Sequence, residues 1–180
     1  MDGSLSHMAT QRDPIREAHG QWLRHGWTDA ADGMAMVTSV ARVQQLLMER
    51  IDAVLRPLDL TFARYEVLRL LSFTQSGSMP MTRLGSLLQV HPTSVTSAVE
   101  RLVRQGYVER LRREHDRRVV LASLTPAGWS VVEAATERLN DQVFEKPGLP
   151  TDDVIRLTEL LGALRASAGD HVADPVVTSQ

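Results

Sequence analysis

Apolar residues recur every three or four positions along most of this chain, which is the spacing of one face of an α-helix. The spacing predicts a short amphipathic helix over residues 14–27. After a break at 29–33, it predicts a long helix over 34–56 that Pro57 ends. The long helix is more evenly apolar than a small isolated domain requires. We therefore expect this helix to pack against a partner chain.

The middle of the chain predicts a pair of short helices. A helix over residues 61–73 begins at a threonine N-cap, and a loop over 75–80 follows it. Two short helices, over 82–88 and 93–105, are then separated by about three residues, and the second also begins at a threonine. Two helices joined by so short a connection predict a helix-turn-helix.

Alternating apolar and polar residues predict a β-hairpin after the helix pair. Its strands lie over residues 107–113 and 119–124, and the charged residues 114–117 form its tip. Thr125-Pro126 begins a further helix, because a capping residue followed by proline suits the first helical turn. A last helix runs over 152–168.

These elements predict a fold that is mainly α with a small β-hairpin wing. A winged helix-turn-helix lobe is flanked by N- and C-terminal dimerisation helices. In sequence order the divisions are an N-terminal extension with a short helix over 1–33, a dimerisation helix over 34–58, the lobe over 59–124, C-terminal dimerisation helices over 125–168 and a flexible tail over 169–180.

Composition excludes several classes of protein. The chain has no cysteine, which removes disulfides, thiolate zinc sites and cysteine nucleophiles. The six histidines lack the spacing of a metal site, and no phosphate loop, GxSxG or HExxH motif is present. No stretch reaches the roughly 18 consecutive apolar residues of a membrane span, and the N-terminus lacks a signal-peptide core. We therefore expect no metal, no cofactor, no membrane partner and no enzymatic activity.

The charge is unevenly distributed along the chain. The formal net charge is −2, yet residues 101–118 contain seven arginines against three acidic residues, a local charge of +4. A concentrated basic stripe on an acidic body is typical of a nucleic-acid-binding protein. Two other interpretations stay open here. The stripe is either a solvated charged hairpin, or the basic face of a winged-helix protein–protein interaction module that binds an acidic partner.

Four motifs lie in the order and spacing of a known family. They are Leu84-Gly-Ser-Leu-Leu, Val99-Glu-Arg-Leu-Val-Arg-Gln-Gly-Tyr-Val-Glu-Arg110, Asp116-Arg-Arg118 and Leu124-Thr-Pro-Ala-Gly128. Over residues 81–128, and with the flanking helices over about 34–168, the chain resembles the MarR family of bacterial transcription regulators. The resemblance implies a cytoplasmic, nucleoid-associated homodimer. Such a dimer binds double-stranded DNA at a pseudo-palindromic operator, more often as a repressor than as an activator.

In helix-turn-helix proteins the second helix enters the major groove of DNA, with its N-terminal turns facing the bases. For the helix over 93–105, the apolar spacing assigns Val95, Val99, Leu102 and Val103 to the inner face. The outward residues, which we expect to contact DNA, are Thr93, Ser94, Thr96, Ser97, Arg101 and Arg104. Because family members often carry a larger hydrogen-bond donor at the position of Ser97, we expect DNA shape to supply part of the specificity.

The hairpin supplies a second group of DNA contacts, from Arg112, Arg113, Arg117 and Arg118. The resemblance implies that its tip enters the minor groove, with Arg118 as the inserted arginine and Asp116 holding it by a salt bridge. In the alternative, the pair formed by Asp116 and Arg118 only stabilises the turn. The other wing arginines are expected to bind phosphates and to make binding salt-dependent.

The resemblance also implies an effector site. Family members commonly bind small phenolic or anionic effectors in a crevice between the dimerisation helices and the DNA-binding lobe, which here involves Phe62 and Tyr65. In the urate-responsive branch a tryptophan, an aspartate and two arginines form the site. This chain has Trp22 as the tryptophan and Glu66 at the aspartate position, with apolar residues at both arginine positions. We therefore do not expect urate to bind, and packing of the extra N-terminal helix is the alternative role for Trp22.

Overall fold

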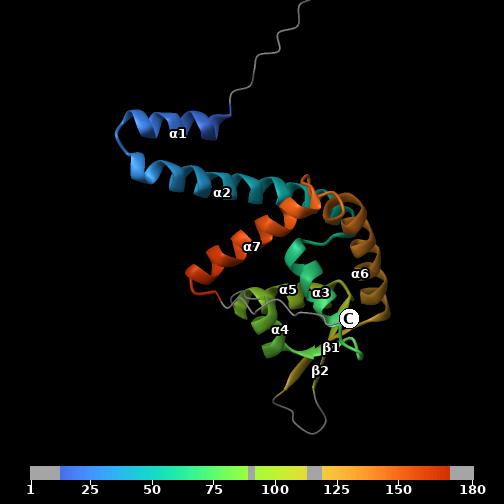
Figure 1. Cartoon of the computed structure of the whole chain (residues 1–180). Helices are drawn as coiled ribbons and strands as arrows, with labels where there is room; N and C mark the ends of the chain where they lie inside the picture. Colours follow the sequence, from blue (N-terminus) through green and yellow to red (C-terminus); the bar gives the residue numbers. More distant parts are fainter. Residues whose placement is uncertain (1–12, 89–91, 113–118, 171–180) are drawn as a thin grey trace, which may run out of the picture.

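The computed structural model describes residues 13–88, 92–112 and 119–170. Helices form a lobe around one small sheet, and a helical arm projects from this lobe (Figure 1). In chain order the elements are α1 (Pro14–Arg24), α2 (Thr28–Leu55), the short 3₁₀ helix η1 (Arg56–Leu58), α3 (Phe62–Ser72), β1 (Ser78–Pro80), α4 (Met81–Leu88), α5 (Pro92–Arg104), β2 (Val108–Arg112), β3 (Val120–Leu124), α6 (Pro126–Leu139), the π-helical turn η2 (Asn140–Phe144) and α7 (Thr151–Ser167).

The arm consists of α1 and the N-terminal half of α2, which lie antiparallel (Figure 1). α1 ends before Gly26, which adopts the left-handed conformation with a φ of 81°. The predicted break at 29–33 is wrong, because these residues form the first turns of α2. The packing of α1 explains the difference, since Ala31 is fully buried and His19 Nε2 lies 2.8 Å from Asp32 Oδ1. Tertiary contact keeps the segment helical where its local sequence does not predict a helix.

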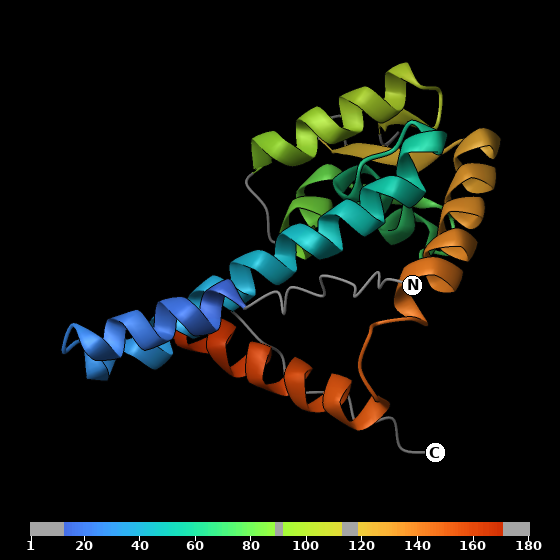
Figure 2. The ribbon, with the colours of Figure 1, turned by 90° about the horizontal axis from the view of Figure 1, so that it is seen from above.

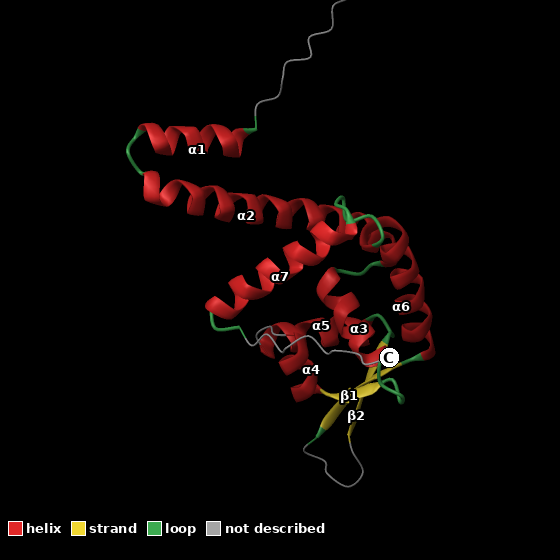
Figure 3. Cartoon of the chain, in the orientation of Figure 1, coloured by secondary structure: helices red, strands yellow, loops and turns green. Residues whose placement is uncertain are grey.

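The lobe places α3, α4 and α5 around a three-stranded antiparallel sheet in the order β1-β3-β2 (Figure 3). β1 pairs with β3 from Ser78, opposite Ser123, to Pro80, opposite Leu121. This strand lies in the segment 75–80, for which the sequence predicts a loop, so that prediction is wrong at its C-terminal end. Three residues are too few to show the alternation of apolar and polar positions that predicts a strand. This segment is a strand because it pairs with β3.

One apolar core joins the lobe to the C-terminal end of α2 and to α6. The largest fully buried side chains are Leu55, Val67, Leu68, Leu71, Leu84, Val99, Leu102, Val108, Val132 and Leu139. Because residues from both flanking helices enter this core, α2 and α6 have a fixed position relative to the sheet and to α5.

Two predicted N-caps are confirmed and one is wrong. The side-chain oxygens of Thr61 and Thr125 accept a backbone N–H three residues further on, at the starts of α3 and α6. α5 begins at Pro92, so Thr93 lies inside the helix. Proline suits this first position because its missing N–H has no partner within the helix.

The start of α6 is anchored to the end of α5 and to the start of β2. Thr125 Oγ1 donates to the carbonyl of Gly106 at 2.6 Å, and the Thr125 N–H donates to the carbonyl of Tyr107 at 3.1 Å. Gly128 lies so close to this carbonyl that a Cβ would collide with the Tyr107 backbone and would also press on the Leu124 side chain. The approach of α6 to β2 therefore requires glycine at this position.

α7 follows η2 and runs away from α6 (Figure 2). Arg50 of α2 holds the end of η2, because its Nη2 donates to the carbonyls of Gln142 at 3.1 Å and Lys146 at 2.9 Å. Every residue of α7 keeps some exposure to solvent. The exposed large apolar side chains of α2 and α7 are Met36, Val37, Val40, Val43, Leu46, Leu47, Ile155, Leu157, Leu160, Leu161 and Leu164. None of the helices in the described ranges combines the length and the apolar character needed to cross a membrane.

We expect Gly128→Ala to lower the free energy of unfolding by about 2 kcal/mol or more, because a rigid backbone carbonyl cannot move away from the new methyl group. Gly85→Ala is the matched control, since a Cβ at this position in α4 meets nothing within 4 Å. Alanine should there raise stability by about 0.5–1 kcal/mol. Urea unfolding followed by circular dichroism measures both changes. A Gly128→Ala variant as stable as the wild type would contradict the required close approach.

Candidate nucleic-acid interface

α5 turns a polar face away from the core. Val95, Val99 and Leu102 are buried, as the apolar spacing predicts. The prediction that Val103 also faces inward is wrong, because its side chain is 37% exposed. Successive helix positions differ by about 100° around the axis, so the residue after Leu102 leaves the buried stripe.

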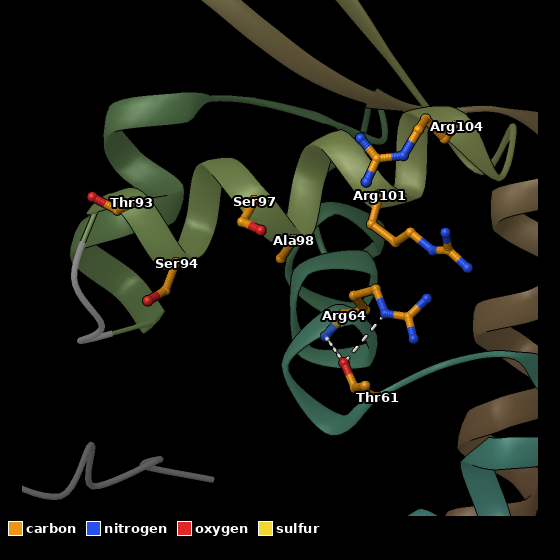
Figure 4. A pocket seen from close by; sticks show the side chains of 8 residues that line it. All are labelled: Thr61, Arg64, Thr93, Ser94, Ser97, Ala98, Arg101 and Arg104. Carbon is orange, nitrogen blue, oxygen red and sulfur yellow. Dashed lines mark hydrogen bonds between the residues drawn. The ribbon is translucent and has the colours of Figure 1, made fainter.

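The polar face of α5 borders a hollow between α5 and the start of α3 (Figure 4). The hollow is lined by Thr61, Arg64, Thr93, Ser94, Ser97, Ala98, Arg101 and Arg104. Five of the six residues of α5 that the sequence predicts to contact DNA therefore line one surface. The sixth, Thr96, lines a groove between α4 and α5 together with Thr82 and Ser86. All six side chains are exposed.

The two halves of the α5 face differ in chemistry. Hydroxyl groups of Thr93, Ser94 and Ser97 lie toward its N-terminal half, and the guanidinium groups of Arg101 and Arg104 lie toward its C-terminal end (Figure 4). A hydroxyl both donates and accepts hydrogen bonds, whereas a guanidinium only donates and is always charged. Such a face can hydrogen-bond a polar, anionic polymer along the whole length of the helix.

Arg64 is a cation of the hollow that sequence reasoning does not identify. It lies on α3, its side chain is only 12% exposed, and its Nη1 donates to the carbonyl of Asp59 at 2.7 Å and to Gln105 Oε1 at 2.8 Å. Gln105 is 41 positions further along the chain. A local sequence pattern does not link residues so far apart, so this contact becomes visible only in the fold.

Asp59 brings a carboxylate to the same surface from the turn between η1 and α3. Its backbone is left-handed, with a φ of 50°. The Asp59 carbonyl accepts from Gln105 Nε2 at 2.8 Å, and Oδ2 of its carboxylate accepts from the same nitrogen at 2.9 Å. Oδ2 also lies 3.5 Å from Arg101 Nη2. The turn after the long helix is thereby tied to the C-terminal end of α5.

β2 and β3 form the two strands of the predicted wing, with Arg112 opposite Val120 at the outer end of the pairing. Arg112 is exposed, as a DNA contact requires. The remaining predicted wing residues lie outside the described residues and their roles stay predictions: Arg113, Asp116, Arg117 and Arg118.

Three of the predicted effector residues lie together on α3. The rings of Phe62 and Tyr65 are roughly parallel with centroids 6.1 Å apart, and the Tyr65 hydroxyl lies 3.2 Å from Thr136 Oγ1 of α6. Glu66 follows them on α3 and is half-buried, and this burial raises the pKa of its carboxyl. Among the residues that the structure describes, no group of three or more His, Cys, Asp and Glu side chains is placed to hold a metal ion.

Trp22, the fourth predicted effector residue, lies apart from the other three. It belongs to α1, which packs along the N-terminal half of α2, whereas α3 packs against α5 and α6 (Figure 1). Its ring meets the ring of Trp27 edge-on, with centroids 5.1 Å apart, and the ring of His25 stacks on the ring of Trp27. Within a single chain, Trp22 therefore packs against Trp27 at the end of the arm. Its role as a ligand contact stays a prediction.

Comparison with known proteins points to one family. A family model described as MarR family matches residues 60–120, from the start of α3 to the first residue of β3. The chain is also similar to the multiple antibiotic resistance protein MarR of Salmonella typhimurium. The two are 32% identical over 109 residues, which make up 59% of this chain and 74% of that protein.

Solved structures agree with this comparison. Sco5413, a MarR family transcriptional regulator from Streptomyces coelicolor, superposes with a TM-score of 0.69 at 43% identity and covers 78% of this chain and 99% of its own. A mutant MarR from Escherichia coli, complexed with operator DNA, superposes with a TM-score of 0.66 at 28% identity. That match covers 75% of this chain and 96% of the other.

We expect Glu66→Gln to raise the melting temperature at pH 7. Burial raises the pKa of Glu66 in the folded state above its ordinary value of 4.5, so the folded state binds this proton more readily than the unfolded state. Stability then falls as the pH rises from 4.5 through the higher pKa that Glu66 has in the folded state, because burial disfavours the ionised carboxylate. Glutamine mimics the protonated form. The gain should therefore shrink as the pH falls toward 4.5.

Thermal unfolding of the two proteins between pH 4 and pH 8 tests this expectation. Glu137→Gln, on an exposed position of α6, controls for the loss of one negative charge. A stabilisation by Glu66→Gln that is the same at every pH would contradict the burial argument.

Proposed function

The chain belongs to the MarR family of transcription regulators, and from this premise we propose that it acts as a homodimer that binds a pseudo-palindromic DNA operator. The polar face of α5 carries the proposal, because three hydroxyl residues and two arginines lie together on one exposed helix surface. Similarity to a MarR complexed with operator DNA supports the same mode of binding.

In this proposal α5 enters the major groove. The groove admits one helix, and the buried face of α5 leaves its polar face directed outward. Thr93, Ser94 and Ser97 hydrogen-bond base edges or phosphates, while Arg101 and Arg104 bind phosphates or guanine. Side chains this short reach few bases, so the shape of the DNA supplies part of the specificity.

The wing binds the adjacent minor groove. Arg118 inserts into the groove, where a narrow A·T-rich segment concentrates negative potential, and Asp116 orients its guanidinium. Arg112, Arg113 and Arg117 bind phosphates on either side. The exposed position of Arg112 supports this arrangement, because Arg112 is the last residue of β2 and pairs with Val120 at the end of the sheet.

Two copies associate through α2 and α7. A monomer would leave their large apolar side chains in water, and an apolar surface of this extent is typical of an interface. The two-fold axis of such a dimer sets two copies of α5 about 34 Å apart, which matches one turn of DNA.

A small effector acts on this regulator from the crevice beside α3. Phe62 offers partly exposed aromatic surface and stacks on Tyr65, whose own side chain is only 6% exposed. The apolar residues at both arginine positions of the urate-responsive branch leave an anion such as urate without its partners. Binding of the effector releases the dimer from DNA. Repression is the expected outcome at operators that overlap a promoter, because the bound dimer excludes the polymerase there.

The wing mechanism predicts that Arg118→Ala abolishes recovery of operators. Fragmented genomic DNA is incubated with the protein, captured and sequenced, with wild type and variant side by side. We expect a few sharp palindromic peaks for the wild type. The variant should bind the same sites about tenfold or more weakly by fluorescence anisotropy, because it loses a groove contact in each half-site. Arg138→Ala, on the exposed side of α6, is the control and should bind as the wild type does.

Equal binding by Arg118→Ala and wild type would contradict the minor-groove contact. An absence of any salt-dependent DNA binding by the wild type would overturn the regulator itself. That result would favour the interaction module with an acidic protein partner.

The dimer interface predicts that Val40→Glu or Leu160→Glu produces monomers, because a buried unpaired carboxylate opposes association at each copy of the contact. Leu87→Glu, at an exposed apolar position of α4, is the matched control and should stay dimeric. Sedimentation velocity at micromolar concentration distinguishes the two masses. Dimers of the Val40→Glu and Leu160→Glu variants would exclude α2 and α7 as the interface.

A further inference from the structure

Asp59 places a negative charge against the DNA-binding face that we propose for this chain. Its Oδ2 lies 3.5 Å from Arg101 Nη2, and the Arg101 side chain is half-exposed. A carboxylate at this position repels DNA phosphates and lowers the affinity for DNA in general. The arginines around Asp59 strengthen binding to DNA, whereas Asp59 weakens it, so its role cannot be the same as theirs.

The position of the Asp59 carboxylate is set by several contacts rather than by the ion pair alone. Gln105 Nε2 donates both to the Asp59 carbonyl at 2.8 Å and to Oδ2 at 2.9 Å. Arg64 Nη1 donates to the same carbonyl at 2.7 Å and to Gln105 Oε1 at 2.8 Å. An ordinary surface pair must immobilise two long side chains, which removes most of its benefit. Here Asp59, the acidic partner of Arg101, is already held in place by Gln105 and Arg64.

We propose that Asp59 is a specificity-determining residue: by neutralising Arg101, it lowers the affinity of the regulator for DNA of random sequence. This inference rests on the proposed function, because it assumes that α5 binds DNA. Binding to random DNA gains its free energy from the counterions that each bound cation releases from the phosphates. An arginine that already contacts a carboxylate contributes less to this release.

Operator DNA responds differently from random DNA. The ion pair with Asp59 restricts the orientations of Arg101, so the contact that the operator makes with this guanidinium needs less ordering of the side chain. For operator binding, the neutralisation of Arg101 lowers the affinity while the ordering of its side chain raises it. For binding to random DNA, the neutralisation is the main effect. Asp59 therefore increases the ratio between the two affinities.

Asp59→Asn tests the proposal. Asparagine tolerates the left-handed backbone and keeps a side-chain oxygen for Gln105 while removing the charge. We expect the variant to bind random duplex DNA roughly three- to tenfold more tightly than the wild type. The slope of log K against log salt should steepen by about 0.9 for each Arg101 that gains a phosphate. Operator affinity should change by less than the affinity for random DNA.

A double-mutant cycle separates neutralisation of Arg101 from a general effect of charge. In an Arg101→Gln background, Asp59→Asn should tighten binding to random DNA far less, because the more exposed of the two arginines beside the Asp59 carboxylate is absent. The other, Arg64, lies 4.0 Å from Asp59 Oδ1 and is only 12% exposed. Asp141→Asn removes the carboxylate of η2 that forms an exposed pair with Lys146, and it should leave the salt slope unchanged. Thermal unfolding verifies that each variant folds. Asp59→Gly, which also accepts a positive φ, replaces any asparagine variant that does not fold.

Two results would overturn the inference while leaving the proposed function intact. One is an unchanged salt slope and unchanged affinity for random DNA in Asp59→Asn. The other is an equal effect of that substitution with and without Arg101. If the wild type binds neither operator nor random DNA, the proposed function fails, and the inference fails with it.

Discussion

The burial of one face of α5 is the interaction on which the rest of the structure depends. Val95, Val99 and Leu102 lie in the core of the lobe, and burying an apolar side chain of this size stabilises a fold by roughly 1.5–3 kcal/mol. Because helix positions have fixed angular spacing, the same burial decides which residues face outward. The rotation of the face that we propose to bind DNA is therefore set by packing in the core and not by the charged residues themselves.

The C-terminal end of α5 is held from two sides. Gln105 ties it to the Asp59 turn, which directly follows α2 and η1. Thr125, at the start of α6, binds the carbonyl of Gly106, and Gly128 allows the close approach of α6 to β2. Both flanking helices thus reach the same end of one short helix. The position of α5 relative to α2 and α6 is thereby set at its C-terminal end as well as by the core.

Most of the architecture could be predicted from local patterns, because apolar periodicity and capping residues determine helices of ordinary length. Thr61 and Thr125 cap α3 and α6 as predicted, and five outward residues of α5 meet at one hollow. The errors at Val103 and Thr93 are local, because they concern the angular position of one residue and the first residue of α5. The two errors in secondary structure have a common cause in contacts between distant segments. The start of α2 is helical because α1 covers Ala31, and β1 is a strand because β3 lies beside it.

The same cause explains which residues of the candidate site escaped prediction. Arg64 and Asp59 enter the site through Gln105, which is more than forty positions away from each of them along the chain. Thr96 is an outward residue by helix spacing, yet α4 lies beside it, so it borders a different groove from its neighbours. Helical spacing identifies the side of a helix that avoids the core. Which neighbouring element shares that side depends on the tertiary fold.

The charge of the molecule suits selective rather than strong binding to DNA. A genome presents a very large excess of random sites, so occupancy of an operator depends on the ratio of two affinities and not on the tighter one alone. Each added cation strengthens binding to every sequence, because phosphates are the same everywhere. This chain has a net charge of −2, and seven of its 20 basic residues lie within the stripe over residues 101–118. The carboxylate of Asp59 lies within reach of that stripe at Arg101. An acidic body and an acidic group at the interface both reduce the sequence-independent part of binding, which leaves base contacts and DNA shape to decide where the protein stays.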